Sequence, residues 1–212
     1  MKTLFIFLLL PAFIVKAPSF EKMMDPAMKS YYKAESVEEM LQVADRFATI
    51  KDAYPNEWTP AYYEALLLVS ASFDVNDAKQ RLALLERSKP IIKALEQKWP
   101  NEHEIHTLHS LYYCAALVAD MRRAPELSPM IQVSAGKALE IAPNNPRAHY
   151  LKISNNMGKA SYFGQDVSAY CLQAQEALLS FDTFQSETPY APVWGKDLLQ
   201  GLTQSCKDST TP

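Results

Sequence analysis

Prolines that follow apolar helical patterns at nearly regular intervals constrain this sequence more than any other feature. Pro-Asn pairs begin at Pro55, Pro100 and Pro143, about 45 residues apart, and Pro189 continues the spacing. A proline cannot continue the helix before it, and the asparagine after it can cap the next helix. An interval of this length holds two helices and two turns, so the sequence predicts a series of helix pairs.

The residues between these prolines carry apolar side chains at the three- to four-residue spacing of one helix face. Such stripes occupy residues 37–48, 62–73, 105–119, 131–142 and 171–184. Ser36 and Glu39 form a capping box before the first stripe. Pro90 either kinks or splits the helix that leads to Trp99.

The same periodicity continues to the end of the chain. Trp194, Leu198 and Leu202 fall on one face of a terminal helix. No segment shows the sustained alternation of apolar and polar residues that a strand requires, and five glycines leave few positions for tight turns. We therefore predict an all-α fold, a short α-solenoid of three to four helix pairs with a C-terminal capping helix.

Residues 1–19 are predicted to be a secretory signal peptide. A lysine at the second position precedes an apolar run, residues 4–15, which is too short for a helix that crosses a bilayer. Cleavage after Ser19 is preferred over cleavage after Ala17, because the latter would leave Pro18 as the first mature residue. The alternative interpretation is a core helix at the N-terminus.

The mature chain is therefore expected to be an exported, soluble periplasmic protein without a membrane span. No cysteine lies near the cleavage region, which argues against a lipoprotein anchor. Residues 20–206 would form one helical repeat domain, and residues 207–212 a disordered tail.

Composition and charge narrow the possible functions. The chain has 212 residues, of which 48% are hydrophobic and 21% charged, so it can bury a core. Its net charge of −3 argues against nucleic-acid binding, which needs a basic face. No Gly-x-Ser-x-Gly nucleophile motif is present, and the carboxylates are scattered. We predict a protein that is not an enzyme and needs no cofactor.

The cysteines leave two interpretations open. Cys114, Cys171 and Cys206 are too few for a disulfide scaffold. In an oxidising compartment, Cys171 and Cys206 can form a bridge if the last two helices pack antiparallel. Otherwise all three cysteines are small buried apolar residues.

Three histidines provide the alternative function, a metal-binding protein or a metal-dependent enzyme. His103, His106 and His109 are spaced by three residues, which brings neighbouring imidazoles close enough on a helix to share a metal. The spacing is not that of the His-Glu-x-x-His zinc proteases. The competing interpretation is a solvated histidine cluster at the start of a helix.

Tyrosine pairs at helix starts are candidates for a binding groove, because tyrosine joins apolar area to a polar tip. The competing interpretation is packing between helices. The candidate partner-binding residues are Tyr62, Tyr63, Tyr112, Tyr113, Arg147 and Tyr150.

Residues 155–168 carry two of the five glycines and no apolar stripe. We predict a long connection between helices there, which is either functional or a plain surface insertion.

Several segments resemble known repeat proteins. Residues 137–150, which read Lys-Ala-Leu-Glu-Ile-Ala-Pro-Asn-Asn-Pro-Arg-Ala-His-Tyr, look like the end of one tetratricopeptide repeat and the start of the next. Residues 57–63, 145–148 and 186–196 together resemble a group of exported tetratricopeptide-like proteins of Bacteroidetes without assigned activity. Members of that group carry a run of glycines where this chain has Phe-Gly-Gln at residues 163–165.

The resemblance implies a helical repeat domain and supplies no catalytic residues. Concave surfaces of stacked helix pairs bind peptides or protein surfaces. We therefore predict a non-enzymatic periplasmic protein-interaction or scaffold module. Its partner is expected to be a protein or peptide, and neither the identity of that partner nor the oligomeric state follows from the sequence.

Overall fold

The computed structural model describes residues 18–186 and 188–208, and regular structure within these residues is entirely helical. The expected all-α class is thereby confirmed. The helices are α1 (Phe20–Tyr31), α2 (Val37–Ala53), α3 (Trp58–Asp74), α4 (Ala78–Lys98), α5 (His103–Ala119), a 3-10 turn (Met121–Arg123), α6 (Ala124–Ile141), α7 (Pro146–Tyr162), α8 (Ser168–Thr183) and α9 (Lys196–Asp208). Apart from Pro18 and Ser19, the expected signal peptide lies outside the described residues.

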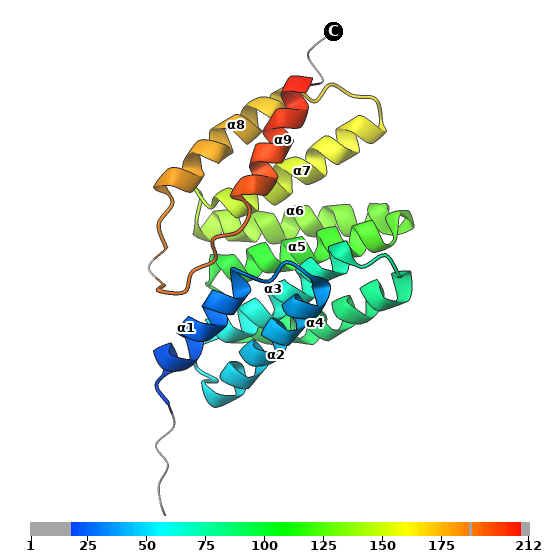
Figure 1. The fold of residues 1–212 in the computed structure, drawn as a ribbon. Helices are drawn as coiled ribbons and strands as arrows, with labels where there is room; N and C mark the ends of the chain where they lie inside the picture. Colours follow the sequence, from blue (N-terminus) through cyan, green and yellow to red (C-terminus); the bar gives the residue numbers. More distant parts are fainter. Residues whose placement is uncertain (1–17, 187, 209–212) are drawn as a thin grey trace, which may run out of the picture.

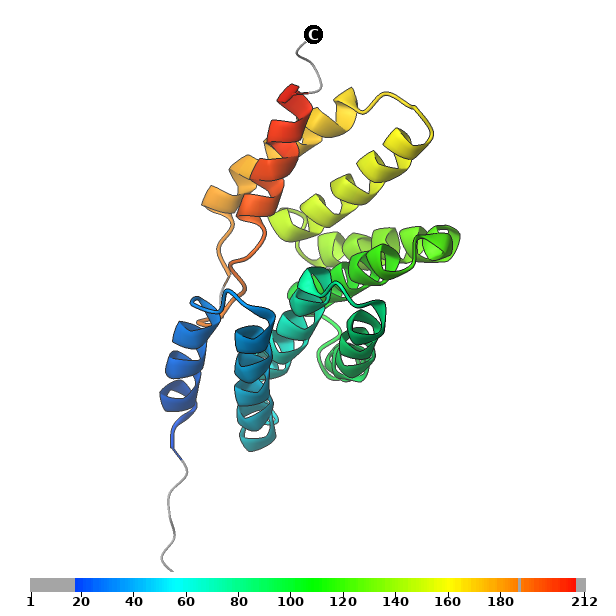
Figure 2. The same cartoon turned by 45° about the vertical axis from the view of Figure 1, so that its right-hand side comes forward.

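Consecutive helices pack against each other along the chain, which gives a solenoid-like stack (Figure 1). Helix α3 also contacts α5, α5 contacts α7, and α7 contacts α9, so these four helices form a continuous layer. Helices α1 and α2 lie at one end of the stack, and α8 and α9 lie at the other (Figures 1 and 2).

The Pro-Asn pairs end helices as expected, but their asparagines do not cap the helices that follow. Helices α2, α4 and α6 all stop just before such a pair. In each case a backbone N–H three residues further on donates to the carbonyl of the residue before the proline, at 3.0 to 3.1 Å. The proline and asparagine therefore occupy the middle of a β-turn. The N-caps are the next residues along, Glu57, Glu102 and Asn145.

Pro90 does not split the helix around it, because α4 runs without interruption from Ala78 to Lys98, which excludes one of the two alternatives that the sequence left open. One expectation about helix boundaries needs correction. The long connection predicted over residues 155–168 was wrong, since α7 continues to Tyr162 and only residues 163–167 connect it to α8. A Cβ at Gly158 would meet no atom within 4 Å, so this glycine serves no special turn and simply lies in the helix.

The core consists of one large cluster of buried apolar residues and one small one. The large cluster extends from α1 to α7. The small cluster contains Ile153, Ala174, Ala177 and Leu199, from α7, α8 and α9. The C-terminal helix pair therefore has its own apolar packing, separate from that of the main stack.

A disulfide between Cys171 and Cys206 joins α8 to α9, which settles the pairing that the sequence left open. Cys114 is a free thiol, and burial raises its pKa to about 12.

Helix α9 begins only at Lys196. Its Leu199 is buried, whereas Leu198 is 49% exposed. The predicted stripe of Trp194, Leu198 and Leu202 was therefore wrong in register.

Residues 188–195, which we call the strap, precede α9 and lie far from their sequence neighbours. The connection between α8 and α9 runs back across the molecule to α1 (Figures 1 and 2). Tyr190 contacts α1, and Trp194 contacts α3. Pro189 thus does not follow a helix as the prolines of the three Pro-Asn pairs do, because five residues lie between it and the end of α8.

Helix α9 extends through Asp208, so Lys207 and Asp208 are helical rather than part of a tail, and residues 209–212 lie outside the described residues. Within the described ranges, none of the helices has the length and apolar character needed to cross a bilayer.

We predict that the disulfide stabilises the C-terminal helix pair. The bridge closes a segment of 35 residues, and loop-closure entropy over this length corresponds to about 3 to 4 kcal/mol in the free energy of unfolding. Dithiothreitol should lower the denaturation midpoint of the wild type and leave a Cys171→Ser, Cys206→Ser variant unchanged. A Cys114→Ser variant is the matched control and should remain as sensitive to reductant as the wild type.

Candidate functional site

The tyrosines predicted to line an open groove are mostly covered. Tyr62 and Tyr63 of α3 have no exposed surface, and Tyr112 of α5 is also buried. Tyr113 and Tyr150 are half-buried and pack against the main core. In this structure the first two tyrosines lie beneath the strap, so the free binding surface expected at them is absent.

Arg147, the remaining predicted binding residue, is also buried. Its Nη2 lies 2.7 Å from Oε1 of Glu104 and its Nε lies 3.0 Å from Oε2, which makes a bidentate ion pair between α7 and α5. Asn145 joins the pair: its side chain caps α7 and donates from Nδ2 to Glu104 Oε1 at 2.9 Å. Burial alone would raise the pKa of Glu104, but His103 and Arg147 lower it overall, so the carboxylate is ionised.

The ion pair lies directly beneath the segment that leads from α8 to α9. The guanidinium carbon of Arg147 is 5.6 Å from the ring centroid of Phe184, and His103 meets the same ring edge-on. Gly195 approaches from the other end of this segment. A Cβ there would lie 3.2 Å from Cγ of Arg147, and its φ of 102° also favours glycine. Arg147 thus contacts both ends of this connection.

The three clustered histidines do not form a metal site. His106 and His109 both direct Nδ1 at Oε1 of Glu96, at 3.3 and 2.7 Å. Nδ1 of His103 instead lies 2.9 Å from Nδ2 of Asn145. Across the described residues, no group of three or more histidine, cysteine or acidic side chains is arranged to hold a metal ion. The proposed cluster of His103, His106 and His109 was therefore wrong as a single site.

Glu96 and His106 form a charged pair rather than a ligand set. Burial would raise the pKa of Glu96, but the two imidazoles outweigh it and lower the pKa to about 2. Both ring nitrogens of His106 face acceptors, Glu96 and the carbonyl of Pro100, which favours the imidazolium form. The hydrogen bond to Glu96 accordingly raises the pKa of His106 despite burial.

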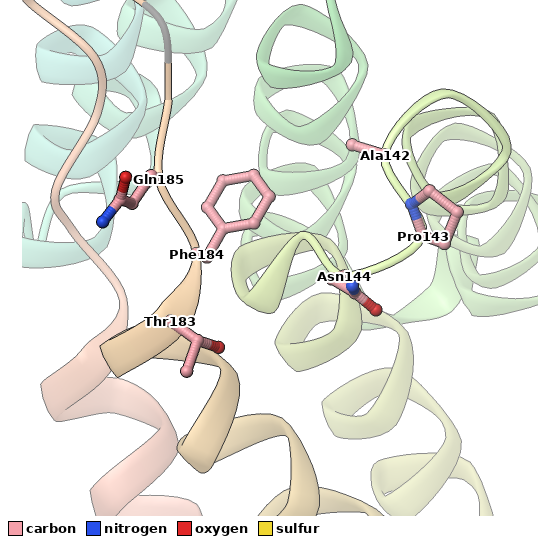
Figure 3. A pocket seen from close by; sticks show the side chains of 6 residues that line it. All are labelled: Ala142, Pro143, Asn144, Thr183, Phe184 and Gln185. Atoms are coloured by element: carbon pink, nitrogen blue, oxygen red, sulfur yellow. The ribbon is translucent and has the colours of Figure 1, made fainter.

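Two hollows open where α8 meets the rest of the molecule. The first, the turn pocket, has a volume of about 390 Å³ and is shown in Figure 3. Phe184, at the end of α8, faces the turn between α6 and α7 across it. Its lining residues are Ala142, Pro143, Asn144, Thr183, Phe184 and Gln185.

The second hollow, the α7–α8 groove, has a volume of about 370 Å³. It is lined by His149, Lys152, Ile153, Asn156, Gln173, Glu176, Ala177 and Ser180. Nε2 of His149 donates to the carbonyl of Pro143 at 2.7 Å, so the groove and the turn pocket are neighbours.

Sequence reasoning missed Glu104, Asn145, Glu96 and Phe184. Asn145, directly before the proline that starts α7, was visible as a cap, and Glu104 stood out as an acidic residue at the opening of an apolar helix. Glu104 and its partners Asn145 and Arg147 lie about 40 positions apart. Glu96 meets His106 and His109, 10 and 13 positions away on the next helix, and Phe184 lies in a connection without periodicity, so no local pattern encodes these contacts.

Comparison with known proteins supports the fold. No family model matches the chain, and no curated protein matches its sequence. A similar solved structure is the haemophore HusA from Porphyromonas gingivalis, with a TM-score of 0.78 and 22% identity over 92% of this chain and 96% of that one. That organism belongs to the Bacteroidetes, the group that the sequence resemblance indicated. The tetratricopeptide character of the repeats stays a prediction.

We predict that Glu104→Gln strongly destabilises the protein. The substitution leaves the buried Arg147 charge without a counter-ion, which typically costs about 3 to 5 kcal/mol in the free energy of unfolding. Urea denaturation measures this loss. The matched control is Glu126→Gln, whose partner Arg123 is exposed, and it should leave the midpoint unchanged. Equal midpoints for the two variants would contradict the assigned importance of the buried pair.

A second prediction concerns pH. Because the pKa of Glu96 is lowered, its contribution to stability is present above its ordinary value of 4.5 and is lost as the pH falls toward about 2. Because the pKa of His106 is raised, its contribution is present below 6.5 and is lost as the pH rises through the raised value. The difference in melting temperature between wild type and Glu96→Gln should therefore be largest between about pH 4.5 and 6.5. A difference in melting temperature that does not change with pH would contradict this prediction.

Proposed function

We infer that this chain is a non-enzymatic, exported binding protein whose ligand is a tetrapyrrole of the haem class. The observation that carries this proposal is the likeness of nearly the whole chain to a haemophore, combined with two adjoining hollows at its C-terminal helices. Shared fold alone does not fix a ligand, so the chemistry of the hollows must support the assignment.

Export and a periplasmic location are supported by two independent features. Residues 2–19 contain a lysine, a short apolar run and small residues in the order that secretory signal peptides have. The bridge between Cys171 and Cys206 is a bond that persists in oxidising compartments such as the periplasm.

The two hollows together offer the groups that a tetrapyrrole needs. A porphyrin is a flat apolar ring system with carboxylates at one edge. Phe184 in the turn pocket provides apolar surface, and Ile153 and Ala177, which are almost completely buried, form the apolar floor of the groove. Lys152 is exposed at the groove and can pair with a carboxylate.

His149 distinguishes the groove from the other histidine sites. Of the four histidines, His103, His106 and His109 approach buried or half-buried carboxylates. His149 instead contacts a backbone carbonyl through one ring nitrogen and lines the groove. Imidazole is a common ligand of haem iron, so this residue fits an iron-containing tetrapyrrole.

Titration with haemin tests the proposal. The Soret band should shift on binding at a stoichiometric ratio, and tryptophan fluorescence should be quenched. Gln173→Trp places a large ring in the groove and should weaken binding at least tenfold. Gln175→Trp is the matched control, because residue 175 lies on α8 but does not line the groove.

A second pair of variants tests the charged contact. Lys152→Ala should weaken haemin binding severalfold, whereas Lys159→Ala, on an exposed position of the same helix outside the groove, should not. Absence of a stoichiometric complex, or equal affinity in all four variants, would rule out a tetrapyrrole site here.

A protein-interaction or scaffold role is the second candidate, and exposed apolar side chains favour it. Leu172 and Leu179 stand seven residues apart on α8 and are 63% and 71% exposed, so they share one outward face. Tyr162 and Phe163 form an exposed aromatic pair at the end of α7. Crosslinking in intact cells should capture a partner through this surface, and a Leu172→Ser, Leu179→Ser variant should lose it.

A further inference from the structure

The α7–α8 groove has two walls that carry opposite charges. Helix α7 contributes His149, Lys152, Ile153 and Asn156, and helix α8 contributes Gln173, Glu176, Ala177 and Ser180. Lys152 is therefore the cation of one wall, and Glu176 is the anion of the other. Both residues are exposed, so a ligand in the groove can reach both charges.

The two charges of the groove do not neutralise each other. Among the residues that the structure describes, neither Lys152 nor Glu176 has an ion-pair partner, although both line the same groove. Each charge is therefore available to a ligand. A ligand that spans the groove meets a positive group at the α7 wall and a negative group at the α8 wall.

No second lysine or arginine lines either hollow. Arg147 of α7 is buried against Glu104, and Lys196 of α9 pairs with Asp182 at 2.6 Å. Helix α8 contains no lysine or arginine along its whole length, and the residues that line the turn pocket are all uncharged. Beside one imidazole, the two hollows therefore offer a ligand a single lysine and a single glutamate.

Tetrapyrroles differ in where they carry carboxylates. Haem has its propionates at one edge of the ring, whereas coproporphyrin and uroporphyrin have carboxylates around the whole ring. The carboxylate edge of haem can lie against Lys152 while uncharged parts of the ring face Glu176. A ring with carboxylates on all sides must place one of them near Glu176, and the two like charges repel each other.

We propose that Glu176 determines the ligand specificity of the groove, which selects tetrapyrroles with carboxylates at one edge and disfavours those with carboxylates around the ring. This inference rests on the proposed tetrapyrrole function and narrows its ligand class. Lys152 attracts the carboxylate edge to the α7 wall, and Glu176 keeps carboxylates away from the α8 wall. Repulsion of the wrong ligand is a common source of specificity in binding sites.

The selection depends on ionic strength because Glu176 is exposed. Dissolved ions screen the repulsion between its carboxylate and a carboxylate of the ligand. The contact between the porphyrin ring and the apolar floor of Ile153 and Ala177 is not screened in this way. The preference for haem should therefore be large at low salt and decrease at high salt, whereas a preference based on the shape of the groove would not change.

Titration of the chain with haemin, ferric coproporphyrin III and ferric uroporphyrin III tests this proposal. At low salt, the Soret band should show that the wild type binds haemin at least tenfold more tightly than either of the other porphyrins. Glu176→Gln should strengthen the binding of ferric coproporphyrin at least fivefold and change that of haemin less than twofold. Asp197→Asn is the matched control, because it removes an exposed carboxylate of α9 that lines neither hollow, and it should leave all affinities unchanged.

A charge reversal gives a second, independent measurement. Glu176→Lys places a cation on the α8 wall and should make ferric coproporphyrin bind at least as tightly as haemin. Equal affinity of the wild type for these two porphyrins, equal effects of Glu176→Gln and Asp197→Asn, or a preference that high salt leaves unchanged would overturn the role of Glu176 and leave the tetrapyrrole site in place. Absence of binding by all three porphyrins would overturn both the site and its selectivity.

Discussion

The bidentate ion pair between Glu104 and Arg147 is the interaction on which the rest of this structure depends. Both side chains are almost completely buried, so neither charge can be left without the other. The pair joins α5 to α7, while Asn145 both caps α7 and donates to the same carboxylate. Phe184 and Gly195 then pack on Arg147 from the two ends of the α8–α9 connection. One buried charge pair thus positions the C-terminal helices against the main stack.

This arrangement separates two surfaces with different chemistry. The α7–α8 groove and the turn pocket lie around helices that the ion pair and the disulfide position, and they carry a histidine, a lysine and apolar side chains. Tyr62 and Tyr63 of α3 lie toward the other end of the stack and are covered by the strap.

Periodicity predicted the helices well and the contacts between distant residues poorly. The prolines at 55, 100 and 143 and the stripes between them gave the all-α class, and α2, α4 and α6 end where the prolines require. The tyrosine pair at residues 62 and 63 indicated a groove, but the pattern held no information about the strap that fills it. The histidine spacing suggested one cluster. In the structure, His106 and His109 contact Glu96, whereas His103 contacts Asn145.

The sequence by itself determined the class of the fold and the ends of α2, α4 and α6, because these depend on local backbone preferences and on the spacing of apolar side chains. Only the tertiary structure decided that Arg147 is buried against Glu104, that Trp194 reaches Tyr62 and that His149 opens onto a groove. These contacts join segments about 40 to 130 residues apart, and their energies depend on burial and hydrogen-bond partners that exist only once the helices have packed.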